Sequence, residues 1–338
     1  MLVSAMVLAN VGVVPKSAPA YDTVWSFAVP VAVPLLLLQA DLRRIIPETG
    51  PILAAFFFGA LGTLLGTLLG VALLDLGDST PKLAAVFSAG YIGGSMNFAA
   101  VSEALRFDEA TLLTAALAAS NVVGMTFFIL LVMLPSLAVV RRLLPAPSDN
   151  EGMSDDPEDD VELGGVQLRL FDVSFVLTLS FVICELGYWT AGALGIDSYS
   201  ILFITGYTLI VANLFPARLR ALTGSYEIGM LLMFLFFASI GASADFTKLV
   251  VNGPTLALFA GIILTTHIVV VLLGAKLFKL RIDETIVGSV ACMTGPANAA
   301  AVAASRQWRH LITPGVLCGV LGYAIASFIG VALADILS

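Results

Sequence analysis

Residues 93–101 read GGSMNFAAV and lie inside an apolar segment that is otherwise typical of a membrane span. Two glycines, a serine and an asparagine stand at its centre, where leucine or valine would suit lipid better. Backbone groups that such glycines free from a helix are costly in hydrocarbon unless they are packed in protein or line a polar cavity. We therefore predict a helix that is broken at Gly93 and Gly94 and faces the protein interior.

A second segment repeats this pattern 201 residues later, where residues 294–302 read TGPANAAAV. Gly94 and Asn97 correspond to Gly295 and Asn298, and Pro296 strengthens the prediction of a second helix break. Other matches follow in the same order: Ala9-Asn10 with Ala212-Asn213, Asp41 with Asp245, and Gly50-Pro51 with Gly253-Pro254. Because four matches keep one order, they indicate an internal duplication.

The composition predicts an all-α polytopic membrane protein. Of the 338 residues, 59% are hydrophobic and only 12% are charged, which excludes an ordinary soluble domain. We predict about 11 spans, at 1–15, 21–41, 51–75, 81–105, 109–140, 170–192, 198–216, 224–244, 254–279, 283–305 and 310–337. No cleavable leader is evident, and the short first segment leaves two alternatives open: its helix extends toward Lys16, or upstream sequence is absent.

Eight acidic residues between Asp149 and Glu162 carry the whole net charge of -8, since the remaining acids balance the 16 lysines and arginines. We interpret this run as a disordered tether, placed in the cytoplasm by the positive charges near it. The chain is then divided into four parts: a first transmembrane repeat at 1–142, a linker at 143–169, an extra helix at 170–197 and a second repeat at 198–338.

Five predicted spans of one repeat pair with five of the other, and paired broken helices favour an inverted arrangement. Six spans separate each pair, however, whereas inverted repeats need an odd number. Two alternatives stay open: the stretch 108–141 crosses more than once, or 170–192 does not cross completely.

Several motifs resemble one family over essentially the whole chain: Ala9-Asn-Val-Gly-Val-Val-Pro15, Tyr21-Asp22, residues 35–44 (LLLLQADLRR) and residues 93–101. This is the YjcL-like family of uncharacterised integral membrane proteins, itself similar to sodium/proton antiporters and bile-acid sodium symporters with the NhaA-like fold. The resemblance implies two broken helices that cross near the midplane and an elevator-like shift of a core domain. The antiporter carboxylates are absent from Ala118-Ala-Ser-Asn-Val122, which favours the sodium-symporter pattern.

The candidate solute and ion site comprises the polar and unwound positions of both breaks and of the span after the first. These are Gly94, Ser95, Asn97, Glu103, Ser120, Asn121, Thr294, Gly295, Pro296 and Asn298. Oxygen atoms suit a hard cation, so we predict sodium at Asn97, Glu103, Asn121 and Asn298. Glu185 is either a functional intramembrane acid or a structural residue. His267 is either a proton carrier or a structural residue.

Apart from Lys82 at the start of the span 81–105, the presumed core spans hold no lysine or arginine, so we expect a weakly bound anion or a neutral or zwitterionic solute. These features favour a secondary active transporter of a small organic solute in the plasma membrane, coupled to sodium or protons. A cation/proton antiporter and a non-transporting membrane sensor are the alternatives. We expect no enzyme activity, no cofactor other than sodium and no nucleic-acid partner; the lipid bilayer and the solute are the expected partners, and a homodimer is left open.

Overall fold

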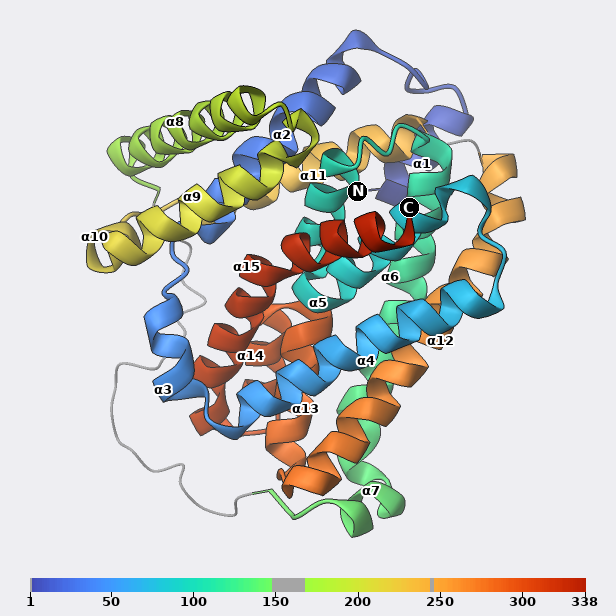
Figure 1. The fold of residues 1–338 in the computed structure, drawn as a ribbon, viewed down its shortest axis with the longest axis vertical. Helices are drawn as coiled ribbons and strands as arrows, with labels where there is room; N and C mark the ends of the chain where they lie inside the picture. The colour runs from blue at the N-terminus through green and yellow to red at the C-terminus, as the bar shows by residue number, and fades with distance from the viewer. Residues whose placement is uncertain (1, 148–167, 244–245) are drawn as a thin grey trace.

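The computed structural model describes residues 2–147, 168–243 and 246–338, and these ranges form helices joined by turns, without strands (Figure 1). The long helices are α2 (Pro19–Leu37), α4 (Pro51–Leu73), α5 (Thr80–Ala104), α6 (Ala110–Met133), α8 (Leu170–Leu194), α11 (Ser225–Ser243), α12 (Phe246–Phe278) and α15 (Ile312–Leu337). The shorter ones are α1 (Leu2–Asn10), α3 (Ile45–Thr49), α7 (Ala138–Leu143), α9 (Ser200–Leu214), α10 (Pro216–Arg220), α13 (Ile282–Thr294) and α14 (Pro296–Ser305).

The eight long helices are each apolar and long enough to cross a membrane, within the part of the chain that the structure describes. This confirms the prediction of an all-helical, multi-pass membrane protein. Three predicted spans are not among the eight: α1 has nine residues, α9 has 15, and the segment 283–305 is divided between α13 and α14. The total of about 11 crossings therefore stays a prediction.

The two largest differences between predicted and observed boundaries lie at the start of α12 and at the end of α6. Helix α12 begins at Phe246, eight residues before the predicted start, and continues through Pro254. Prediction failed here because proline is tolerated inside membrane helices when neighbours satisfy the freed backbone groups. The stretch 108–141 contains one long helix, α6, and a six-residue α7 that is too short for a second crossing. Most of the acidic linker, 148–167, and Asp245 lie outside the described residues.

Helices α4 and α12 lie side by side in an antiparallel pair (Figure 1). A β-carbon placed on Gly62 would lie 2.7 Å from the Cα of His267, and one on Gly66 would lie 2.7 Å from the Cα of Ile263. α4 and α12 therefore run in opposite directions. Since both positions are glycine, the two backbones approach closely, as is common between membrane helices.

Helices α5 and α15 form a second antiparallel pair with close backbone approach. A β-carbon on Gly93 would lie 2.6 Å from that of Ala326, and one on Gly330 would lie 3.0 Å from that of Ala89. α15 thus covers one side of the predicted break in α5. This placement decides which residues of the break are buried.

A separate group of helices packs around α2, which lies against α11, α8 and α9 (Figure 1). The turn after α2 is tied to the turn between α9 and α11: Asn213 Oδ1 accepts a hydrogen bond from the backbone N–H of Leu42 at 2.9 Å, and Asp41 pairs with Arg220. Gln39 Nε2 donates to Ser225 Oγ at 3.2 Å. Asp41 and Asn213 therefore have structural partners at a turn.

Candidate functional site

Both predicted helix breaks are confirmed, and they share one backbone conformation. Gly94 interrupts α5 with φ 73° and ψ -178°, and Gly295 separates α13 from α14 with φ 86° and ψ -176°. A positive φ combined with an extended ψ is a conformation that essentially only glycine adopts. Glycine adopts this conformation without strain, which is why the helices can break at these two positions.

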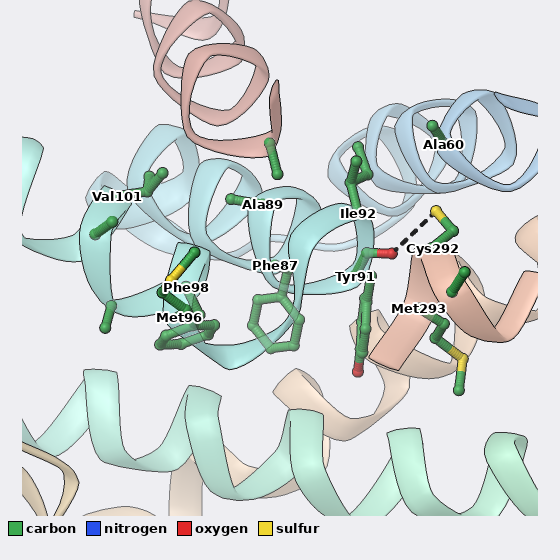
Figure 2. Packing of buried hydrophobic residues seen from close by; sticks show 14 of the residues in the cluster. Ala60, Phe87, Ala89, Tyr91, Ile92, Met96, Phe98, Val101, Cys292 and Met293 are labelled. Carbon is green, nitrogen blue, oxygen red and sulfur yellow. Dashed lines mark hydrogen bonds between the residues drawn. The ribbon is translucent and has the colours of Figure 1, made fainter. Parts of the chain in front are cut away.

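The two breaks lie next to each other, although 201 residues separate them. A β-carbon placed on Gly94 would lie 4.0 Å from the carbonyl oxygen of Thr294. One turn earlier, the thiol of Cys292 donates to the carbonyl oxygen of Tyr91 at 3.5 Å (Figure 2). The break in α5 and the break between α13 and α14 therefore form a single unwound region.

Tyr323 of α15 contacts both breaks. Its hydroxyl would lie 3.0 Å from a β-carbon on Gly295, and its ring carbon Cε1 would lie 3.6 Å from one on Gly94. Pro296 packs against α15 as well, because a β-carbon on Gly319 would be 2.5 Å from the Cα of Pro296. α15 thus forms the floor of the unwound region.

A cavity of about 390 Å³ opens on the other side of the breaks, between α5, α6, α13 and α14. Six predicted site residues line it: Gly94, Ser95, Ser120, Asn121, Thr294 and Asn298. They come from three separate parts of the sequence, and the fold brings them to one space. Their role in binding a ligand stays a prediction.

Hydrogen-bonding groups in this cavity are only partly used by the protein. Asn298 Nδ2 donates to the carbonyl oxygen of Thr294 at 3.3 Å, which leaves its amide oxygen free. The side chains of Ser95, Ser120 and Asn121 have no hydrogen-bond partner among the described residues, although Ser120 is only 8% exposed. Polar groups in such positions are normally satisfied, so these are available to a ligand or to water.

The other four predicted site residues lie elsewhere. Asn97 is 1% exposed; its Nδ2 donates to the carbonyl oxygen of Gly93 at 2.9 Å, and its Oδ1 accepts from Ser327 Oγ at 2.5 Å. Gly295 and Pro296 face Tyr323 and Gly319 of α15.

Glu103 lies with Arg106 at the end of α5, where both line two smaller cavities of about 120 and 60 Å³. The structure therefore does not gather the four predicted sodium ligands, because Asn121 and Asn298 share the large cavity whereas Asn97 and Glu103 are outside it. Among the described residues, no group of three or more histidine, cysteine, aspartate or glutamate side chains forms a metal site.

Sequence reasoning missed the aromatic and thioether part of the cavity. Its lining includes Tyr91, Phe98, Met125, Phe128 and Met293. Tyr91 reaches across to α6, where its hydroxyl donates to the carbonyl oxygen of Ser120 at 3.1 Å, and Met293 extends on the same side (Figure 2). A signal was present: lining residues of α5 and α6 recur every three or four positions, as one helix face requires.

His267 is fully buried between α4, α12 and α13, away from this cavity. Its Nδ1 lies 3.0 Å from Thr63 Oγ1 and its Nε2 lies 2.8 Å from Ser289 Oγ. Both ring nitrogens thus have partners, which supports a structural role. Glu185 is exposed on α8, the helix predicted to have no counterpart.

Comparison with known proteins agrees with the membrane fold. Residues 1–338 match the family described as "Protein of unknown function (DUF819)". The chain is also 35% identical, over 349 residues, to the "Uncharacterized membrane protein YjcL" of Bacillus subtilis (strain 168), with 97% of this chain and 86% of that protein covered. The chain therefore belongs to the DUF819 family of multi-pass membrane proteins.

Proposed function

We propose that this protein is a secondary active transporter of the plasma membrane that moves a small organic solute, coupled to sodium, by an elevator-like alternating-access mechanism. The observation that carries the proposal is the pair of adjacent helix breaks at Gly94 and Gly295 beside a cavity of about 390 Å³. Non-helical backbone at membrane depth survives where it lines a cavity, and paired broken helices are typical of transporter binding sites. The cavity is large enough for a small molecule.

Two repeats of five helices are part of this proposal, and detailed matches between the broken segments support them. Asn97 and Asn298 each donate to the carbonyl oxygen four residues earlier. Arg106 and Gln307, 201 residues apart, both have a positive φ although neither is glycine. The next residues, Phe107 and Trp308, each donate from the backbone to the carbonyl oxygen five positions earlier. A shared helix end of this kind favours a common origin.

An inverted orientation of the repeats is supported by the packing of paired helices. α4 and α12 are antiparallel, and α2 and α11 are antiparallel as well, since Gln39 meets Ser225 while Gly229 meets Leu36. Inversion requires an odd number of crossings between partners. With 15 residues, α9 is about 22 Å long, which is less than the roughly 30 Å of a hydrocarbon core. We propose that α9 does not cross the membrane completely.

The cavity also supports an assignment of sodium and solute to one space. Hard cations prefer oxygen ligands, and the free oxygens of Ser95, Ser120, Asn121 and Asn298 face one space. No carboxylate is among the described residues that line it. This favours sodium symport over cation/proton exchange, which needs a group that releases a proton. It also favours transport over enzyme activity, because the described residues that line the cavity include no pair of nucleophile and base.

The test is uptake into proteoliposomes that contain the purified protein. With a panel of small organic solutes, we expect at least one to accumulate under an inward sodium gradient and not under a potassium gradient. Asn298→Ala should abolish this uptake. Ser305→Ala, on the same helix α14 but bonded only to the carbonyl oxygen of Val302, should leave it intact.

Two outcomes would overturn the proposal. Sodium-driven acidification changes without any organic solute would identify a cation/proton antiporter. An absence of sodium-dependent flux of solute or protons, in protein that retains its fold, would favour a sensor or another non-transporting membrane protein.

A further inference from the structure

The cavity beside the two breaks has two chemically different walls. One carries uncharged hydrogen-bonding groups, chiefly Ser95, Asn121 and Asn298. The other is formed by aromatic, aliphatic and thioether side chains, including Phe98, Leu117 and Phe128. A solute that fills this space must pair with the first wall and remove apolar surface from water on the second. The lining therefore selects for a molecule with a polar group and an apolar group.

No side chain that lines this cavity, in the part of the chain that the structure describes, belongs to Asp, Glu, Lys, Arg or His. Arg306 turns away to α6, where it donates to the carbonyl oxygen of Val132 at 2.5 Å, and Glu103 lines separate cavities. An ion that leaves water for a site without an opposing charge pays a large desolvation cost. Sodium offsets much of this cost, because several free oxygens of the lining can surround so small an ion, whereas the charged group of an organic solute meets them from one side only. The lining thus disfavours an organic solute with a full charge.

The helix ends at the breaks do not replace a missing charge. At each break the positive N-terminal end of one half-helix adjoins the negative C-terminal end of the preceding half, so their fields largely offset. Asn298 reduces the partial negative charge at the C-terminal end of α13, because its Nδ2 donates to the carbonyl oxygen of Thr294. What remains is a set of neutral donors and acceptors.

We propose that the solute is an uncharged amphipathic molecule, with an amide or hydroxyl group held by Ser95, Asn121 and Asn298 and an aromatic or aliphatic group held by Phe98, Leu117 and Phe128. This assignment rests on the proposed transport function, whose cavity it specifies. It excludes both carboxylate and ammonium compounds as preferred ligands.

The experiment compares solutes that differ only in charge. On each of three scaffolds (benzyl, isobutyl and indolylmethyl), the primary amide, the carboxylate and the amine are titrated against the purified full chain in nanodiscs with sodium. Binding is measured by calorimetry. On at least one scaffold we expect the amide to bind at least 10-fold more tightly than both charged analogues.

A charge variant tests whether this selectivity belongs to the cavity. Asn298→Asp places a negative charge in the lining and should shift the preference from the amide to the amine. Ser305→Asp adds the same charge on α14 outside the lining and should leave the amide preferred.

The inference is overturned if a carboxylate or an amine binds the unmodified protein most tightly, or if no amide binds on any scaffold. Its failure is distinguishable from a failure of the transport proposal. Sodium-driven uptake of a carboxylate would retain the transport proposal and refute the neutral solute. Amide binding without sodium-driven uptake would retain the neutral ligand and refute the transport proposal.

Discussion

The segments 93–101 and 295–302 share a sequence pattern and a backbone break, yet their asparagines have opposite surroundings. Asn97 is buried against α15 and bonded to Ser327, whereas Asn298 is exposed to the cavity. Gly93 has no room for a side chain, whereas Thr294, 201 residues later, carries one. The asparagine of the pattern is therefore used for packing in the first segment and for lining the cavity in the second.

The difference arises from the neighbouring helix and not from the broken segment itself. α15 packs closely on α5, and its Gly322 and Ala326 meet Gly93. α6, which holds the corresponding place in the proposed repeat, leaves the cavity between itself and α14. In an alternating-access transporter, the two halves would exchange these environments: the packed half would come to line a cavity, and the half that lines the cavity would become packed. Variants at matched positions can break or sharpen this comparison.

The largest loss of stability is expected when Gly93, the most tightly packed position of the first segment, is replaced by threonine, the residue at the matched position 294. In Gly93→Thr, the new β-carbon would lie 2.6 Å from both the carbonyl oxygen of Gly322 and the β-carbon of Ala326, so α5 and α15 cannot keep their contact. We expect loss of the folded protein, measured by size-exclusion chromatography of the detergent-solubilised variant. The reciprocal Thr294→Gly should cost only about 1 kcal/mol, the usual penalty of glycine in a helix. A well-folded Gly93→Thr protein would contradict the packing described for α5.

A smaller loss is expected from alanine at the breaks. Gly94→Ala and Gly295→Ala each force a side chain into a positive-φ, extended conformation, which costs about 1–3 kcal/mol. Gly295→Ala should be the worse of the two, because its β-carbon would lie 3.0 Å from the hydroxyl of Tyr323 whereas the nearest atom at Gly94 is at 3.6 Å. Thermal unfolding of the two proteins in detergent measures the difference. Equal stability to the unmodified protein would mean that neither break is under the predicted constraint.

The sequence predicted the breaks and failed to predict their surroundings, for a physical reason. Gly-Gly and Gly-Pro at mid-span are local signals, so the positions of Gly94 and Gly295 could be predicted without knowing their neighbours. Asn97 and Asn298 have nearly the same local sequence, and their different burial depends on whether α15 or the cavity lies beside them. Composition carries no information on that choice.

The same limit applies to individual residues of the candidate site. Ser120 and Asn121 were predicted from their polarity on an apolar helix, and they do line the cavity. Tyr323 and Ser327 were missed because each lies on α15 among small residues, where only tertiary contact reveals that they meet Gly295 and Asn97. Glu103 was included for its charge, yet it lies at the end of α5, away from Asn121 and Asn298.

The two asparagines should separate stability from function. Asn97→Ala removes the acceptor of the buried Ser327 hydroxyl and the side-chain bond to the carbonyl oxygen of Gly93, which costs about 1–3 kcal/mol of folding free energy. Asn298→Ala removes a group that faces the cavity, so we expect little loss of stability and loss of sodium-dependent solute uptake. Apparent melting temperatures and proteoliposome uptake measure the two properties. If Asn298→Ala is the less stable protein, the assignment of packing and lining roles is reversed.

The smallest effect is a coupling energy that only one half of the molecule should show. Asn97 and Ser327 share a hydrogen bond at 2.5 Å, whereas Thr126, which precedes Ser327 by the same 201 residues, donates to the carbonyl oxygen of Val122 within its own helix and does not meet Asn298. In SDS-induced unfolding, a double-mutant cycle of Asn97→Ala with Ser327→Ala should give a coupling of about 0.6–1.7 kcal/mol, the range of hydrogen bonds between membrane helices. The matched cycle of Asn298→Ala with Thr126→Ala should be additive within about 0.5 kcal/mol. Equal coupling in both cycles would show that the two asparagines have the same environment in the membrane. That result would contradict the different surroundings described for Asn97 and Asn298.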